Sequence, residues 1–244
     1  MDALCIDRGN TATKLGFVQN GVIDRVERFA NADDDELLSA LRSVAPPVPV
    51  ILAQVGPGSD ALDRWMADRS EAVTLSASTP LPIRLDYDTP ATLGADRLAL
   101  VMGARARFPG HDVLAVDAGT ALTIDLLTAD GTYRGGSIHP GIDLRFRALH
   151  DHTASLPRLQ RLDDERPDLV GRSTEASIRA GVLTAVLHEV DGFVTEHAHQ
   201  RPGLRVVMTG GDAAFFERHL KSTIFVSPHL ALVGLHEILS HPNV

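Results

Sequence analysis

Short apolar runs alternate with longer amphipathic segments along the first part of the chain. The runs have the length of buried strands, whereas the longer segments repeat apolar residues at helical spacing. Asn20-Gly21 separates two runs, and both residues tolerate the positive φ of a tight hairpin turn. Asn31 or Asp33 is placed to cap the first helix. The pattern predicts strands at Ala3–Ile6, Lys14–Val18, Val22–Phe29, Val48–Ala53 and Ala72–Leu75, and helices at Asp34–Val44, Asp60–Arg69 and Gly94–Phe108.

The same order of elements begins again after residue 112. Asp7 precedes Gly21 by 14 residues, and Asp117 precedes Gly131 by the same 14, so the two copies are offset by 110. A two-copy repeat predicts duplicated α/β domains, here residues 1–112 and 113–244. The second copy predicts strands at Val113–Val116, Ala121–Leu127, Tyr133–Ile138, Leu204–Met208 and Ile224–Val226, and helices at Leu144–His150, Thr174–Ala198, Ala213–Leu220 and Leu230–Ser240.

Composition narrows the class of protein. Of 244 residues, 44% are hydrophobic and 23% charged, the balance of a globular protein with a sizeable core. The single cysteine, Cys5, lies in an apolar run, which excludes an internal disulfide framework and indicates a core residue. A net charge of −9 without a clustered basic face predicts no nucleic-acid partner. The chain has neither a membrane-length apolar run nor a signal-peptide pattern, so we expect a cytoplasmic protein without a membrane partner.

Each copy opens with an apolar strand that ends in an acidic turn. The turns are Asp7-Arg8-Gly9-Asn10-Thr11 and Asp117-Ala118-Gly119-Thr120. Glycine lets the backbone approach a ligand closely, and a Thr hydroxyl with neighbouring N–H groups can hold phosphate oxygens. Two such turns predict a clamp for a nucleoside triphosphate, with Asp7 holding Mg²⁺ directly or through water. Lys14 either neutralises phosphate charge or is an exposed strand lysine.

A second group of candidates surrounds the third predicted helix. Asp96 lies at its start, where a carboxylate is stabilised, and is either a catalytic base or only a helix cap. Arg97 can hold the carboxylate of an acidic substrate. Alternatively it lies on the surface or packs against Asp86 or Asp88. Tyr87, in a proline-rich loop, is either a substrate contact or a loop anchor.

Six segments, in order and at matching spacing over nearly the whole chain, resemble the motifs of type III pantothenate kinases. The segments are Asp7–Lys14, Gly94–Arg97, Asp117–Thr123, Gly135–Gly141, Gly171–Thr174 and Thr209–Asp212. This family is similar in fold to actin, hexokinase and Hsp70. The resemblance therefore implies two duplicated ribonuclease H-like domains with a cleft between them, in an enzyme that phosphorylates pantothenate with ATP at the first step of coenzyme A biosynthesis.

The resemblance also implies a role for each matching residue. Asp96 would be the catalytic base, and Asp117 would hold a monovalent cation, K⁺ or NH₄⁺. Thr174 would contact substrate across a homodimer. The implied ATP-binding residues are Asp7, Arg8, Gly9, Asn10, Thr11, Ala12, Thr13, Lys14 and Thr120. The implied substrate-binding residues are Tyr87, Gly94, Ala95, Asp96, Arg97 and Thr174.

Two positions depart from the family pattern. Ser173 stands where the family has Asn, and Arg8 is bulkier than the apolar residue expected there, so that it points either away from ATP or toward it. The long helix after Thr174 has an apolar face that fits either a dimer interface or the monomer's own core. Its members are Ile178, Val182, Ala185, Val186 and Val190.

Two other classes of protein share the acidic turns. A phosphohydrolase of the same fold would hydrolyse phosphoanhydrides, but Gly94–Arg97 argues against it. A non-catalytic accessory or regulatory protein would bind a nucleotide or a partner, and loss of Asp7 or Asp96 would favour that interpretation. Both residues are present.

Overall fold

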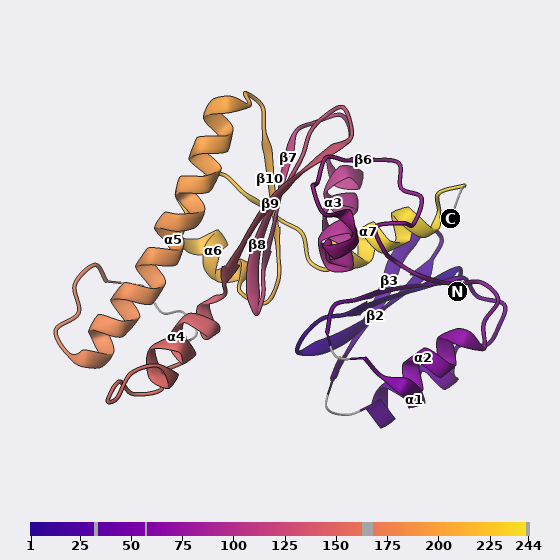
Figure 1. Ribbon diagram of the computed structural model, residues 1–244, viewed down its shortest axis with the longest axis horizontal. Coiled ribbons are helices and arrows are strands. Elements are labelled where there is room, and N and C mark those ends of the chain that lie inside the picture. The colour runs from indigo at the N-terminus through magenta and orange to yellow at the C-terminus, as the bar shows by residue number, and fades with distance from the viewer. Residues whose placement is uncertain (32–33, 57, 163–167, 243–244) are drawn as a thin grey trace. The chain divides into compact units, whose positions relative to one another are not determined.

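The chain forms two compact units in the computed structural model, which describes residues 1–31, 34–56, 58–162 and 168–242 (Figure 1). Unit 1 comprises Met1–Gly110, Leu127–Gly135 and His229–Val244. Unit 2 comprises His111–Leu126 and Gly136–Pro228. The predicted division between residues 112 and 113 stays a prediction, because it was based on the repeat, whereas these units are defined by packing.

Unit 1 is built on a sheet with the strand order β3-β2-β1-β4-β5. Strands β1 to β3 form antiparallel hairpins, whereas β4 pairs in parallel with β1, and β5 with β4. The hairpin turn at Asn20-Gly21 has positive φ at both residues, 53° and 74°, as predicted. The strands are β1 (Ala3–Arg8), β2 (Ala12–Gln19), β3 (Val22–Ala30), β4 (Val50–Gln54) and β5 (Ala72–Thr74).

Helices complete unit 1. Apolar residues of α1 and α2, including Leu37, Leu41 and Leu62, join Leu4 and Ile6 of β1 in one core. Cys5 is fully buried, and burial raises the pKa of its thiol to about 12, so it is the core residue that was predicted. The helices are α1 (Asp34–Arg42), α2 (Asp60–Ala67), α3 (Ala95–Arg107) and α7 (Leu230–Leu239).

Helices α3 and α7 cross closely within unit 1 (Figure 1). A Cβ atom on Gly103 would overlap the carbonyl oxygen of Leu230, and one on Gly234 would overlap that of Ala99. The two backbones therefore touch where glycine is the only residue that fits. By its order in the chain α7 follows the second set of strands, yet it packs in unit 1.

Unit 2 repeats the sheet of unit 1. Its strands lie in the order β11-β10-β7-β8-β9, so each strand occupies the place of its counterpart in the first copy. The turn Gly131 has φ 76°, close to the 74° of Gly21. This agreement confirms the duplication. The strands are β7 (Val113–Ala118), β8 (Ala121–Leu127), β9 (Thr132–Pro140), β10 (Arg205–Thr209) and β11 (Phe225–Val226).

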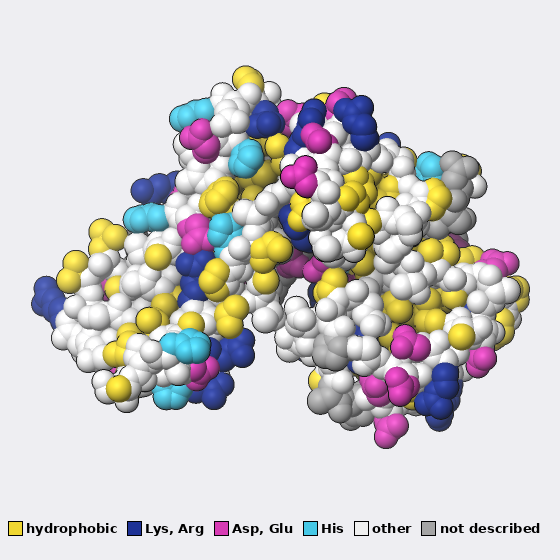
Figure 2. Space-filling model, in the orientation of Figure 1, with side chains coloured by type: hydrophobic (Ala, Val, Ile, Leu, Met, Phe, Trp, Pro, Cys, Tyr) yellow, Lys and Arg dark blue, Asp and Glu magenta, His cyan; other side chains and the backbone are white. Residues whose placement is uncertain are grey.

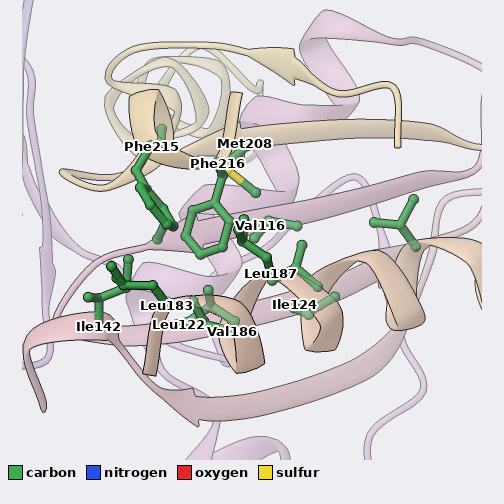
Figure 3. Packing of buried hydrophobic residues seen from close by; sticks show 14 of the residues in the cluster. Val116, Leu122, Ile124, Ile142, Leu183, Val186, Leu187, Met208, Phe215 and Phe216 are labelled. Carbon is green, nitrogen blue, oxygen red and sulfur yellow. The ribbon is translucent and has the colours of Figure 1, made fainter. Parts of the chain in front are cut away.

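The core of unit 2 lies between its sheet and three helices (Figure 3). Val116, Ile124 and Met208 of the sheet meet Leu183 and Phe216 of the helices. The helices are α4 (Ile142–Asp151), α5 (Thr174–Gln200) and α6 (Ala213–His219). Within the described part of the chain, no helix has the length and apolar character needed to cross a membrane.

The segment Ser76–Pro90, predicted as a loop, contains a short strand. β6 (Arg84–Leu85) pairs in parallel with the first residues of β9 in unit 1, and a single 3₁₀ turn, η1 (Pro90–Thr92), follows it. Arg134 donates to Asp86 Oδ2 at 2.7 Å and strengthens this attachment. Two residues are too few for a periodic pattern, which explains why the sequence indicated only a loop.

We expect Gly234→Ala to lower the free energy of unfolding by about 2–3 kcal/mol, because the new methyl group forces the α3 and α7 backbones apart. Urea denaturation followed by circular dichroism measures the change. Gly192→Ala on α5 is the matched control. Gly192 has open space around its Cβ position, so alanine should stabilise that helix by about 0.5–1 kcal/mol. Equal stability of wild type and Gly234→Ala would contradict the tight crossing.

Candidate active site

The first acidic turn begins where β1 leaves the core of unit 1. Asp7 lies opposite Lys14 in the β1–β2 register, and Lys14 Nζ donates to Asp7 Oδ2 at 3.4 Å. The Lys14 side chain is 36% exposed, so the ammonium group reaches both the carboxylate and solvent. Lys14 is thus paired with the aspartate of the turn and is more than an exposed strand lysine.

Backbone hydrogen bonds within the turn and from the segment after β4 hold this turn in place. Gly9 N–H donates to the Ala12 carbonyl at 3.1 Å and closes the turn. The Arg8 carbonyl accepts from the N–H groups of Val55 and Gly56, at 3.1 and 3.3 Å. A Cβ atom on Gly56 would overlap the Gly9 carbonyl, so the chain after β4 packs directly on the turn.

Arg8 points into unit 1. Its side chain is only 2% exposed and its Nη1 donates to Thr13 Oγ1 at 3.1 Å and to Asp34 Oδ1 at 3.3 Å. Thr13 is itself fully buried. The side chains of both residues therefore lie behind the turn. The inward direction explains how a large arginine fits where the family has an apolar residue.

The third helix begins at the predicted substrate motif. Asp96 Oδ1 accepts the backbone N–H of Arg97 at 2.8 Å, so the carboxylate does engage the helix N-terminus. Gly94 precedes the helix as its N-cap residue, and a Cβ atom there would overlap Asp96 Oδ1. Glycine at position 94 therefore leaves the space that the Asp96 carboxylate occupies.

Arg97 is enclosed by two tyrosine rings. Arg97 is buried, with only 6% of its surface exposed. Its guanidinium carbon lies 5.9 Å from the centre of the Tyr87 ring and 6.0 Å from that of Tyr133. The two rings are 5.9 Å apart. Arg97 is therefore not a surface residue, and its guanidinium group lies at a distance where aromatic rings still attract a cation. Tyr133, at the start of β9, was not singled out from the sequence.

Glycine-rich segments of unit 2 converge on its acidic turn. Asp117 pairs with Thr209 at the ends of β7 and β10, and Gly210 has φ 100°. A Cβ atom on Gly210 would overlap Asp117 Oδ1, and one on Gly141 would overlap the carbonyls of Gly119 and Thr120. Three of the motifs predicted from the sequence, at Asp117–Thr123, Gly135–Gly141 and Thr209–Asp212, thus meet at one turn.

Asp212 follows these glycines and is partly buried. Arg161 Nη2 donates to Asp212 Oδ1 at 3.1 Å. Burial raises the pKa of the Asp212 carboxyl group, and the Arg161 charge opposes that rise.

A second carboxylate, Glu189 of α5, accepts from Arg145 Nη2 at 2.7 Å and contacts His139 Nδ1 at 2.6 Å. His139, in the Gly135–Gly141 segment, therefore belongs to an ionic cluster that its sequence context did not indicate.

Thr174 is the first residue of α5, behind the N-cap Ser173, whose Oγ accepts from Ala176 N–H at 3.2 Å. It lines a groove of about 990 Å³ between α4 and α5. Hydrophobic side chains, histidines and arginines share the surface over these helices (Figure 2). Most of the apolar face noted on α5 belongs to the core of unit 2, since Ile178, Val182, Val186 and Val190 are buried there. Ala185 is exposed and lines the groove together with Ile178 and Val182.

Comparison with known proteins decides the family. The family model described as type III pantothenate kinase matches residues 3–196. The chain belongs to the type III pantothenate kinase family. It is 42% identical over 240 residues to the type III pantothenate kinase of Phocaeicola vulgatus, covering 98% of each chain. The corresponding proteins of Bacteroides fragilis and Porphyromonas gingivalis are 38% and 37% identical, again with 98% coverage of each chain.

Solved structures confirm the fold of this family member. A putative 2-dehydro-3-deoxygalactonokinase from Sinorhizobium meliloti superposes with a TM-score of 0.61 at 14% identity, covering 98% of this chain and 97% of that one. A conserved putative Baf family transcriptional activator from Campylobacter jejuni gives 0.59 at 19% identity, with 97% and 96% coverage. The duplicated α/β fold of the actin, hexokinase and Hsp70 type is confirmed.

Proposed function

We propose that the protein phosphorylates pantothenate with ATP to give 4′-phosphopantothenate, the first step of coenzyme A biosynthesis. The observation that carries this proposal is the near full-length similarity to type III pantothenate kinases, 42% over 98% of the chain. The site residues agree with it, since Asp96 opens α3 beside the buried Arg97. Among the residues that the structure describes, none favours a phosphohydrolase or a non-catalytic accessory protein.

Asp96 is the proposed catalytic base. Phosphoryl transfer depends mainly on positioning and on neutralising charge, with a carboxylate to orient the nucleophile. The pantothenate hydroxyl oxygen bonds to the γ-phosphorus while the bond from that phosphorus to the β–γ bridging oxygen breaks. Asp96 takes the hydroxyl proton, and ADP leaves. The hydrogen bond from the Arg97 N–H, at 2.8 Å, holds the carboxylate at the start of the helix.

Residues around Asp96 form the proposed pantothenate site. Arg97 supplies a positive charge for the substrate carboxylate, and Tyr87 lies against its guanidinium group. Gly94 and Ala95 provide close backbone approach at the start of α3. Thr174 is the proposed contact contributed by a second copy of the chain.

The proposed ATP-binding residues lie in and beside the two acidic turns. They are Asp7 to Lys14 and Thr120. Asp7 lies at the strand end with its side chain 12% exposed, and Lys14 Nζ is 3.4 Å from its Oδ2. Mg²⁺ bound to a nucleotide needs only one or two protein carboxylates, because the phosphates supply the other oxygens. Asp7 fits that requirement, directly or through water. The cation would neutralise charge on the phosphates as they react.

Asp117 is the proposed ligand of a monovalent cation, K⁺ or NH₄⁺. Gly119 of its turn and Gly210 of the next segment lie beside it, and a Cβ atom at either position would fill space next to the carboxylate. Glycine carbonyls and a carboxylate are oxygen donors of the kind that such cations accept. The bound cation would offset the negative charge of nearby phosphates.

A cytoplasmic homodimer is the proposed assembly. Its support is the exposed groove between α4 and α5, which brings the apolar Leu149 and Ala185 together with Thr174. Leu169 and Val170, just before α5, are also exposed, at 78% and 76%. A groove with exposed hydrophobic side chains around it is typical of a surface that another chain covers.

The activity is tested by incubating purified protein with Mg²⁺, K⁺, ATP and pantothenate. We expect 4′-phosphopantothenate in the wild type and a kcat lower by about 10²–10⁴-fold in Asp96→Asn, because the base is lost while the side-chain shape is kept. Mass spectrometry quantifies the product. Asp63→Asn, an exposed aspartate on α2, is the control and should retain wild-type kcat. No product in the wild type would refute the function, and an unchanged kcat in folded Asp96→Asn would refute the base.

We expect the rate to fall strongly when Na⁺ replaces K⁺ at equal ionic strength, because the smaller ion fits the Asp117 turn poorly. Asp117→Asn should weaken the response to added K⁺, since the amide carries no charge. Initial rates over a series of K⁺ concentrations measure both effects. Equal rates in Na⁺, K⁺ and NH₄⁺ would remove the monovalent cation from the site and leave the kinase activity standing.

We expect Ala185→Arg to convert the dimer to a monomer and to abolish most of the activity, because a charged side chain would fill the α4–α5 groove. Chromatography with light scattering gives the molar mass. Ala198→Arg, an exposed position near the end of the same helix, is the matched control and should remain dimeric. A fully active wild-type monomer at micromolar concentration would contradict the proposed assembly.

A further inference from the structure

Asn31 holds the first acidic turn at two points. Its side-chain Nδ2 donates to the Gly9 carbonyl at 2.7 Å, and its backbone N–H donates to the Thr11 carbonyl at 3.3 Å. Asn31 follows β3 and lies outside every motif identified in the sequence. A single residue therefore donates hydrogen bonds to the carbonyl groups at both ends of the segment from Gly9 to Thr11.

The hydrogen bond from Asn31 to the Gly9 carbonyl fixes the direction of the peptide group between Gly9 and Asn10. In a trans peptide the carbonyl and the following N–H point in opposite directions. Since the Gly9 carbonyl is turned toward Asn31, the N–H of Asn10 is directed to the opposite side. Outward N–H groups in successive peptides are what a turn uses to hold phosphate oxygens. The orientation of Asn31 thus bears directly on the phosphate-binding face.

The amide of Asn31 is itself oriented by a relay of hydrogen bonds that begins at the buried Arg8. Arginine only donates hydrogen bonds, so Arg8 Nη1 donates to Thr13 Oγ1, and the Thr13 hydroxyl is left to donate to Asn31 Oδ1 at 2.8 Å. With its oxygen facing Thr13, Asn31 presents Nδ2 to the turn. Asp34 pairs with Arg8 at 3.3 Å and accepts from Ser59 Oγ at 2.6 Å. Each donor in the relay therefore has a definite direction.

We propose that Asn31 is a positioning residue for the nucleotide phosphates, with the Arg8–Asp34 pair as its support. It acts through the turn backbone and does not itself touch ATP. This inference rests on the proposed function only in that the turn binds the phosphates of ATP. The proposal also gives a role to Arg8, which replaces the apolar residue of the family pattern. Arg8 fixes the Thr13 hydroxyl group, and this hydroxyl group orients the Asn31 amide.

Two variants of Asn31 separate positioning from charge. Asn31→Asp keeps the size and the acceptor for Thr13 but loses the donor to Gly9, and Asn31→Ala loses both contacts without adding charge. Loss of one such hydrogen bond corresponds to roughly a 2–10-fold change in binding. We expect about tenfold weaker binding of Mg-ATP in both variants by calorimetry without pantothenate. KM for ATP should rise in parallel, and KM for pantothenate should stay at the wild-type value.

Further variants guard against a general loss of stability. Met66→Ala opens a cavity in the core of unit 1 without touching the relay, and it should keep wild-type affinity for Mg-ATP. Arg8→Met should weaken Mg-ATP binding, and its effect should not add to that of Asn31→Ala because both break one relay.

The possible outcomes are distinct. Unchanged affinity in both Asn31 variants would overturn the proposal, as would weak binding in Asn31→Asp alone, which would indicate repulsion by a new carboxylate. An equal rise in both KM values would also overturn it, because that pattern reports general damage. Weaker Mg-ATP binding in both variants of a protein that makes no phosphopantothenate would support Asn31 and refute the proposed function separately.

Discussion

The first strand of each sheet is buried along its length, and this burial decides where polar chemistry can occur. All residues of β1 are buried, with β2 antiparallel on one side and β4 parallel on the other. The neighbouring strands cover the sides of β1, and the chain becomes exposed at Asn10 and Thr11 in the turn that follows it. Asp7 lies near the end of β1, next to this turn, and Asp117 has the same place in β7. The pairing of the strands therefore determines where the turns that follow them lie.

The two copies keep this frame but carry different side chains around it. In unit 1 two ion pairs lie next to the turn, one between Asp7 and Lys14 and one between the buried Arg8 and the partly exposed Asp34. In unit 2 the equivalent of Arg8 is Ala118, and the carboxylate is surrounded by glycine backbone. A duplicated backbone thus gives its two aspartates chemically different surroundings.

Local pattern was sufficient for most of the fold. Strand length, helical spacing and the Asn20-Gly21 and Asp130-Gly131 turns are set by neighbouring residues, and the structure has the predicted elements and hairpins. The family motifs gave the candidate residues, whose roles stay predictions. Contacts between distant segments were missed: Tyr133 beside Arg97, and Asn31, expected as a helix cap, beside Gly9. Asp33, the other candidate cap, lies outside the described residues. Such pairings depend on how strands assemble, which spacing along one segment does not record.

The place of α7 has a consequence for how the protein is made. Unit 1 needs α7 against α3, yet α7 follows all of unit 2 along the chain. A ribosome therefore releases the sheet of unit 1 early but cannot supply its last helix until after residue 228. Unit 2, whose residues 111–126 and 136–228 are complete by then, is able to fold first. Nascent unit 1 meanwhile exposes the apolar surface of α3, which makes it a candidate for chaperone binding during synthesis.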